Sequence, residues 1–322
     1  MTELMSTEDL LNRLTPLRAH CRLDSNGDET AQPDSAHPHM PKCDQLGVVA
    51  VSGPDAGKFL QGQLTCDVLA LAPGEHTLGA CCNPQGRMRA LFHLVRRDQD
   101  FLLLIPRKVV PTFLDALKKY AVFFKASLRD ASSEFQLWGV LGAEPVSAVT
   151  GHTVITLAGP VARQLVLAPA ESGKPALPGA DVPPGDWLAA AILAGEPAIY
   201  AETIEKLLPH HVNLPGVGGV SFSKGCYTGQ EIVARMEYRG KIKTHLRRAT
   251  TPSTAVIAPG CAVRSGDREV GEVVRSAAIA GGQLMLLSLS DQATDGPDID
   301  GVDAGQSLRL GLPEAPILQL RE

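Results

Sequence analysis

The sequence predicts an α+β fold with more than one domain. Apolar residues at the two-residue spacing of strands alternate along the chain with segments at the helical spacing of three and four. Several of the expected strands are joined by short turns, as in hairpins, which favours α+β over a doubly wound parallel sheet. From residue 244 onward, short strand-like segments are separated by Gly, Asp and Pro turns, which predicts a small C-terminal β-barrel. The length of 322 residues suits about two domains, or three small ones.

The first 45 residues predict a helix followed by an extension. Leucines recur at helical spacing within residues 1–23. Residues 24–41 are rich in Asp, Ser, Pro, Gly and His, a composition typical of loops and linkers. We therefore assign residues 1–45 to an N-terminal helix with a flexible extension.

Residues 46–243 predict the main α+β region, with two subdomains. A strand at 46–51 precedes a helix that places Ala56, Phe59 and Leu60 on one face. The Asn-Pro-Gln-Gly sequence at 83–86 predicts a hairpin turn. Further strands are expected at 76–82, 87–95, 100–105, 122–128 and 135–141, with two more in 151–167, and further helices at 109–120, 186–193 and 204–208.

The composition indicates a soluble protein without a metal site. Hydrophobic residues make up 44% and charged residues 20% of the chain, enough for an ordinary core, and the net charge is -5. The N-terminus has no apolar leader, and the apolar run at 187–194 is too short to span a bilayer. The seven cysteines show no zinc or iron–sulfur ligand spacing. We expect a cytoplasmic protein with free thiols, no metal and no membrane contact.

One stretch is hard to explain by packing alone. Thr228 and Glu231 stand three apart before an apolar run, the spacing of a capping box. Cys226 would then lie just before a helix N-terminus and two residues from Lys224, a setting that favours the thiolate. The alternative is that Cys226 is a small buried residue. The stretch consists of Lys224, Gly225, Cys226, Tyr227, Thr228, Gly229, Gln230 and Glu231.

This stretch also carries a family resemblance. K-G-C-Y-T-G-Q-E followed by I-V-A-R is similar to the signature of the YgfZ family of folate-binding proteins, which shares its fold with the aminomethyltransferase (T-protein) of the glycine cleavage system. Two further segments resemble the family pattern: W-L-A-A-A-I-L-A-G-E-P-A-I-Y at 187–200, and G-P-D through F-L-Q-G-Q-L-T-C-D-V at 53–68. The resemblance runs from about residue 46 to the C-terminus and implies an aminomethyltransferase-like fold.

The resemblance implies a site for tetrahydrofolate or a derivative. Trp187 falls on the family's folate-associated tryptophan, although a helical tryptophan buried in the core is the alternative. The family's other folate-associated tryptophan corresponds to about Leu46, a departure that bears on the aromatic clamp. Lys224, Tyr227 and Arg235 would shape the pocket or its polar rim.

A basic segment follows residues 224–231, hereafter the motif. Six cations fall within fourteen residues against the single acid Glu237. They could hold the glutamate tail of a folate or the phosphates of an RNA, or they could form a solvated face. No known RNA-recognition motif accompanies them. The cations are Arg235, Arg239, Lys241, Lys243, Arg247 and Arg248.

The expected function follows from the absence of an acidic residue in the turn at 83–87. In aminomethyltransferases an aspartate pair follows the comparable turn, whereas this turn has no acid to serve as a general acid or base. We expect a folate-binding accessory protein that is non-enzymatic or weakly enzymatic. The resemblance implies that it supports iron–sulfur cluster assembly or repair, with iron–sulfur enzymes, including tRNA-modifying ones, or assembly proteins as partners. The alternatives are a folate-dependent one-carbon transferase or demethylase with Cys226 as nucleophile, and a module that binds tRNA directly.

Overall fold

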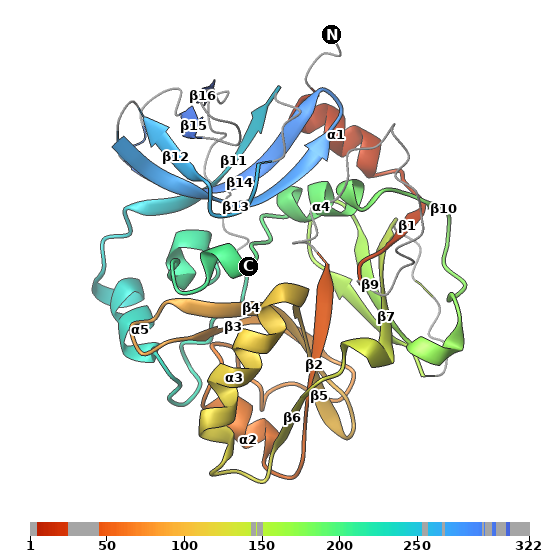
Figure 1. The fold of residues 1–322 in the computed structure, drawn as a ribbon, viewed down its shortest axis with the longest axis vertical. Coiled ribbons are helices and arrows are strands. Elements are labelled where there is room, and N and C mark those ends of the chain that lie inside the picture. Colours follow the sequence, from red (N-terminus) through yellow and green to blue (C-terminus); the bar gives the residue numbers. More distant parts are fainter. Residues whose placement is uncertain are drawn as a thin grey trace. The chain divides into compact units, whose positions relative to one another are not determined.

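The chain forms two compact units, each assembled from separate stretches of sequence (Figure 1). The computed structural model describes residues 5–24, 45–142, 146, 151–252, 257–265, 268–291, 293, 298–300 and 307–309. Unit 1 comprises Met1–Asp44, Ser133–Pro197 and Leu246–Ile317, and unit 2 comprises Gln45–Ser132, Ala198–His245 and Leu318–Glu322. The predicted division into residues 1–45, 46–243 and 244–322 stays a prediction; in the structure residues 133–197 group with unit 1.

Unit 2 is built on a five-stranded antiparallel sheet in the order β3-β4-β5-β2-β6. The predicted hairpin is present, because β3 and β4 pair directly on either side of the 83–86 turn. The strand expected at 122–128 begins later, at Ser127, and Phe123 in the preceding stretch is 82% exposed. The strands are β2 (Leu46–Ser52), β3 (His76–Cys82), β4 (Met88–Arg96), β5 (Asp100–Pro106) and β6 (Ser127–Asp130).

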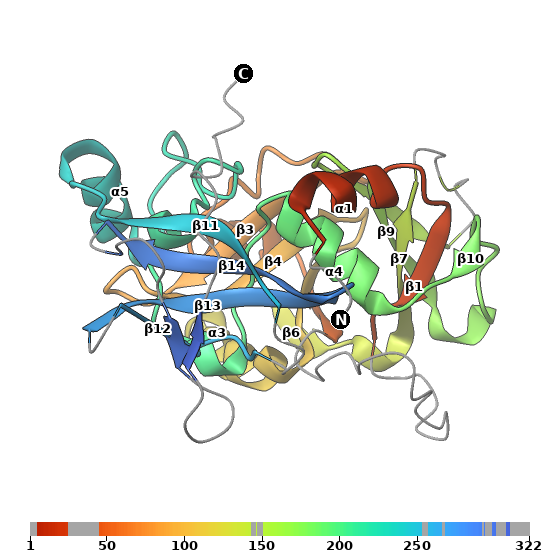
Figure 2. The ribbon, with the colours of Figure 1, turned by 90° about the horizontal axis from the view of Figure 1, so that it is seen from above.

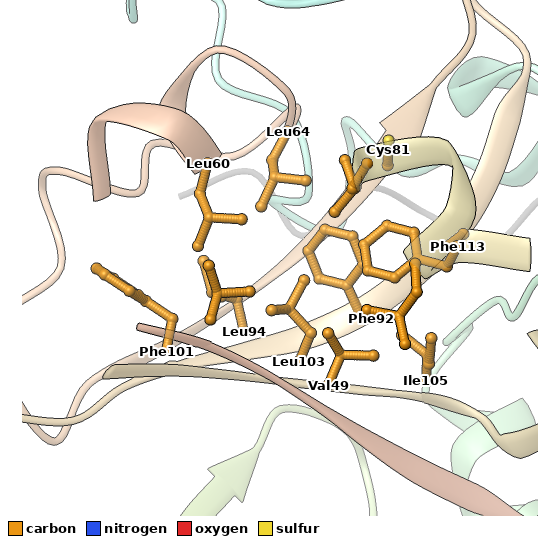
Figure 3. Close-up of a cluster of buried hydrophobic side chains, with 14 of the residues drawn as sticks. Val49, Leu60, Leu64, Cys81, Phe92, Leu94, Phe101, Leu103, Ile105 and Phe113 are labelled. Atoms are coloured by element: carbon orange, nitrogen blue, oxygen red, sulfur yellow. The ribbon is translucent and has the colours of Figure 1, made fainter. Parts of the chain in front are cut away.

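Two helices, α2 (Ala56–Gln61) and α3 (Val110–Ala121), supply the other side of the unit 2 core. Every second residue of β2, β4 and β5 belongs to this cluster, as the two-residue period of a strand requires, and most residues between them are buried as well. Figure 3 shows Phe92 and Phe113 side by side, with ring centroids 5.9 Å apart. The core therefore fixes the end of α2, from which residues 62–68 continue toward the candidate site.

The segment expected to be a helix at 204–208 is not one. Short 3-10 turns occupy Ala201–Thr203 and Pro209–Val212 instead, and Glu205 between them has a φ of 58°. A positive φ is unfavourable for a residue with a side chain and interrupts a helix. The chain then reaches α5 (Gln230–Arg239), the helix that follows the motif.

Unit 1 contains two sheets, in the orders β10-β1-β7-β9-β8 and β11-β14-β13-β12-β15-β16. The second sheet confirms the strand-rich C-terminal region, and its closure into a barrel stays a prediction. Strand β1 was not predicted. The strands are β1 (Ala19–Arg22), β7 (Phe135–Leu141), β8 (Thr153–Leu157), β9 (Arg163–Pro169), β10 (Ala180–Asp181), β11 (Thr244–Thr251), β12 (Ala262–Ser265), β13 (Arg268–Ile279), β14 (Gly282–Ser290), β15 (Asp298–Asp300) and β16 (Ser307–Arg309).

Two helices of unit 1 confirm the helices expected near residues 10 and 190. Helix α1 (Thr7–Leu14) packs on α4 (Pro184–Leu193), and α4 contacts β13 (Figure 2). Residues 187–193 of α4 are all buried. A helix that is apolar on every side belongs in a core. Within the described residues, no helix is long and apolar enough to cross a membrane. The linker expected at 24–41 lies, after Asp24, outside the described residues.

Candidate functional site

The Lys224 side chain binds the loop at residues 224–229 to the rest of unit 2. Its side chain is 8% exposed, and Nζ donates to the carbonyl oxygens of Leu64 (2.6 Å), Gln61 (2.7 Å) and Cys66 (2.9 Å). An ammonium group has three donors, so all of them are used by the backbone that follows α2. The lysine charge that was expected to favour a Cys226 thiolate is instead bound by these three carbonyl groups.

The surroundings of Lys224 lower its pKa. Removal from water disfavours the ammonium form and brings the pKa to about 8, although Cys66 and Asp67 act in the opposite direction. The Tyr227 ring lies against the same group, with Nζ 5.1 Å from the ring centroid. Tyr227 is 7% exposed, and among the described residues its hydroxyl has no hydrogen-bond partner. Burial raises the pKa of this phenol.

Residues of the 61–68 segment join the motif to the sheet. The Thr65 hydroxyl donates to the carbonyl of Gly219 (2.6 Å) and accepts from the amide of Ala80 (2.8 Å), while the Thr65 carbonyl accepts from the amide of Ser221 (2.9 Å). Thr65 is completely buried. Thus two of the family-like segments, more than 150 residues apart in sequence, form one hydrogen-bonded structure. Thr65 and Gln61 lie in the family-like segment at 53–68, and no pattern in the sequence indicates this role for them.

The start of α5 differs from the predicted capping box. The N-cap is Gly229, with a φ of 84° and no side-chain cap, and α5 begins at Gln230. The Thr228 amide donates to the carbonyl of Gly62 (3.2 Å), and its hydroxyl lies 3.4 Å from the Gln63 amide oxygen. The capping box was wrong because Thr228 makes long-range contacts to the 61–68 segment instead of a local cap.

The turn between β3 and β4 packs closely against Gly229. A Cβ atom at Gly229 would overlap the carbonyl oxygen of Asn83 and approach the Cα of Gly86 to 3.1 Å. Asn83 shapes this turn, because its side-chain oxygen accepts from the amides of Gln85 (3.0 Å) and Arg87 (2.9 Å). The hairpin turn, the motif and the start of α5 therefore pack together in unit 2.

Although the turn itself has no acid, the fold brings Glu205 to it. The Glu205 carboxylate accepts from Arg89 (2.6 Å) and from the side chain of Asn83, and these contacts lower its pKa. A carboxylate that stays ionised at neutral pH is a poor proton donor and a weak base. Glu205 was missed in the sequence, because no local pattern around it indicates a contact with Asn83 and Arg89.

Cys226 and Arg235 face outward. Cys226 is exposed, whereas the other described cysteines are buried except Cys261, which is intermediate. A Cβ at the neighbouring Gly225 would meet no atom of the described residues within 4 Å, so this part of the chain leaves open space around the loop. Arg235 is exposed on α5. Of the predicted site residues, the structure thus brings Lys224 and Tyr227 into contact and leaves Cys226 and Arg235 accessible.

Trp187 belongs to unit 1 and is 3% exposed. Its ring lies on β7, where a Cβ at Gly139 would come within 2.5 Å of the Trp187 ring. The guanidinium of the fully buried Arg163 lies 5.5 Å from the ring centroid and pairs with Glu196 at 2.9 Å. These contacts account for Trp187 as a core residue, which was the alternative interpretation. Its contact with a folate stays a prediction.

The comparisons with known proteins agree on one family and one fold. The chain is 33% identical to the tRNA-modifying protein YgfZ of Edwardsiella ictaluri, over 82% of this chain and 89% of the relative. The tRNA-modifying protein YgfZ of Klebsiella pneumoniae is also 33% identical, over 83% and 90% of the two chains. The crystal structure of the glycine cleavage system aminomethyltransferase T from Bartonella henselae is similar in fold, with a TM-score of 0.60, 12% identity and coverage of 99% and 92%. No protein-family model matches the chain.

Proposed function

The chain belongs to the family of the tRNA-modifying protein YgfZ, and we propose that it is a folate-binding accessory protein that presents the Cys226 thiol. In this role it supports iron–sulfur enzymes, including tRNA-modifying ones, through their cluster assembly or repair. The aminomethyltransferase-like fold supports the folate part of the proposal. The names of the relatives support the tRNA part.

The observation that carries the proposal is the exposed Cys226 on a loop whose neighbours are fixed. Lys224 is bound by three carbonyl groups and Tyr227 is buried, so the residues on both sides of the Gly225–Cys226 pair are held in place. A fixed, accessible thiol can exchange disulfides or bind a cluster transiently. The ionised Glu205 at the neighbouring turn makes proton transfer to a folate adduct inefficient, which favours an accessory role over a transferase.

The residues of unit 2 offer two groups that fit a reduced folate. A folate carries a glutamate carboxylate, and the exposed Arg235 guanidinium is suited to bind it. The Tyr227 hydroxyl has no partner among the described residues and can donate to a polar atom of the ligand or to water. Trp187 stays in the proposal as the residue that the family resemblance assigns to the pterin, and its burial makes it the residue to test separately.

Calorimetric titration of the full chain with tetrahydrofolate tests the binding part. We expect saturable heat that Arg235→Ala weakens by about 10-fold or more, since a charge-assisted hydrogen bond is lost. Lys119→Ala, which removes an exposed cation from α3, is the matched control. No saturable heat, or equal weakening by both variants, would overturn folate binding at this site. Trp187→Phe is compared with Trp138→Phe: selective weakening indicates a pterin contact, and unchanged affinity indicates a core role.

The Cys226 part needs a cellular measurement. Cells that lack their native protein receive either the wild-type chain or Cys226→Ser, and the activity of an iron–sulfur tRNA-modifying enzyme is recorded. We expect the serine variant to fail while it accumulates to the same level as the wild type. Full rescue by the serine variant would remove the thiol from the function without affecting the calorimetric result. Product formation from a tetrahydrofolate adduct by the purified chain would instead favour the transferase.

A further inference from the structure

Helix α5 and the residues after it carry an exposed aromatic ring among exposed cations. Tyr238 is 70% exposed, whereas most large hydrophobic side chains of the described chain are buried. Arg239, Lys241 and Lys243 are exposed beside it in sequence. We call Tyr238, Arg239, Lys241 and Lys243 the α5 surface.

The Tyr238 side chain has an aromatic neighbour although most of it is exposed. Phe222 meets it edge-on with a centroid distance of 5.8 Å, and Phe222 in turn lies 6.5 Å from the ring of His210. His210 is buried and its Nε2 lies 3.2 Å from the Glu237 carboxylate. Because the contact with Phe222 already restricts the Tyr238 side chain, the side chain loses little conformational entropy when another flat group stacks on its ring.

The exposed charges next to Tyr238 in sequence are mostly positive. Glu237, the acid next to Tyr238, is turned to His210 and its side chain is only 28% exposed. Arg235 borders the α5 surface one helical turn before Tyr238, and Glu231 lies a turn earlier at the start of α5. A Cβ at Gly240 would approach the Met236 backbone to 2.7 Å, so the glycine lets the chain pass close over the last turn of α5 before Lys241. An ordinary solvent-exposed helix end would account for the cations, but not for an exposed aromatic ring that packs against Phe222.

We propose that the α5 surface binds single-stranded nucleic acid, with a base stacked on Tyr238 and the phosphates held by Arg239, Lys241 and Lys243. Aromatic rings that stack on bases beside cations that follow the backbone are the two parts of such sites. A glutamate tail or an acidic lipid would use the cations but gain nothing specific from the ring. This site is additional to the proposed folate function and does not depend on it.

Fluorescence anisotropy with a labelled oligouridylate tests the proposal on the full chain. We expect saturable binding that weakens with salt between about 50 mM and about 200 mM. Tyr238→Ala should weaken it about 5- to 150-fold, the range for loss of one stacked base. Tyr238→Phe should bind as the wild type does, because it keeps the ring. Phe123→Ala, which removes another exposed ring of unit 2, should have no effect.

The charge variants and the competing ligands complete the test. Lys241→Ala should lower the slope of log affinity against log salt by about 0.7, the value for one phosphate contact to a single strand. Lys119→Ala should leave the slope unchanged. The proposal would be overturned by absence of binding at low salt or by equal losses in Tyr238→Ala and Phe123→Ala. Binding to phosphatidylserine vesicles but not to the oligonucleotide would instead assign the surface to a membrane.

Discussion

Substitution of Gly229 by alanine should destabilise unit 2 much more than the same substitution four residues earlier. Gly229 has a φ of 84°, and an alanine in this left-handed region costs about 1–2 kcal/mol. Its Cβ would also overlap the carbonyl oxygen of Asn83, which belongs to a backbone turn that cannot simply rotate away. Relief of such overpacking by backbone shifts costs about 1–3 kcal/mol. We therefore expect Gly229→Ala to lower the free energy of unfolding by about 2–5 kcal/mol.

Gly225→Ala is the matched control within the same motif. Its Cβ would meet no atom within 4 Å in the described part of the chain, and its φ lies outside the left-handed region, so its effect should range from none to a stabilisation of about 1 kcal/mol. Urea unfolding should be followed by far-UV circular dichroism, because Trp138 and Trp187 both belong to unit 1 and do not report directly on unit 2. If the two variants differ by less than about 0.5 kcal/mol, the tight packing between the turn and α5 is refuted.

Three further predictions concern Lys224, the cysteines and Gly139. Because the pKa of Lys224 is lowered from 10.5 to about 8, the unfolded chain binds more protons between these values. The contribution of Lys224 to the free energy of unfolding should therefore rise with pH from about 8 to 10.5, by up to about 3 kcal/mol. It is measured as the difference between the wild type and Lys224→Met at each pH, because the buried thiols titrate over the same range in both chains. Mass spectrometry during iodoacetamide treatment should show Cys226 modified well before the buried thiols, since burial raises the pKa of Cys21, Cys66 and Cys81 to about 12. Gly139→Ala should destabilise unit 1 by about 1–3 kcal/mol and shift the tryptophan emission, since its Cβ would meet the Trp187 ring at 2.5 Å.

Most of the regular elements could be predicted because their signals are local. Strands β2 and β5 of unit 2 are short apolar runs in which nearly every residue is buried, and α3 places Phe113, Leu114 and Leu117 inward at helical spacing. The capping box failed because Thr228 has the right spacing to Glu231 but is bound by Gly62 and Gln63. No local pattern encodes such partners.

The division into units and the site could be predicted only in part for the same reason. The chain passes between units at 45, 133, 198 and 246, and each passage depends on which distant segment a strand joins. The motif at 224–231 was recognisable, but the direction of the Lys224 side chain depends on carbonyl groups about 160 residues earlier. Glu205 itself has a positive φ, and a positive φ at a residue other than glycine cannot be predicted from this sequence.

The contacts of the motif separate its structural residues from its chemical one. Lys224 holds the chain after α2, Thr228 binds the same segment, and Gly229 makes room for the turn of Asn83. Replacement of any of these three would therefore reduce function through folding, whatever the chemistry of the protein. Among the described residues, no such structural contact explains Cys226, since it is exposed and a Cβ at its neighbour Gly225 would meet none of their atoms within 4 Å. Loss of function in Cys226→Ser at unchanged stability would therefore report on thiol chemistry, whereas the same loss in Lys224→Met would not.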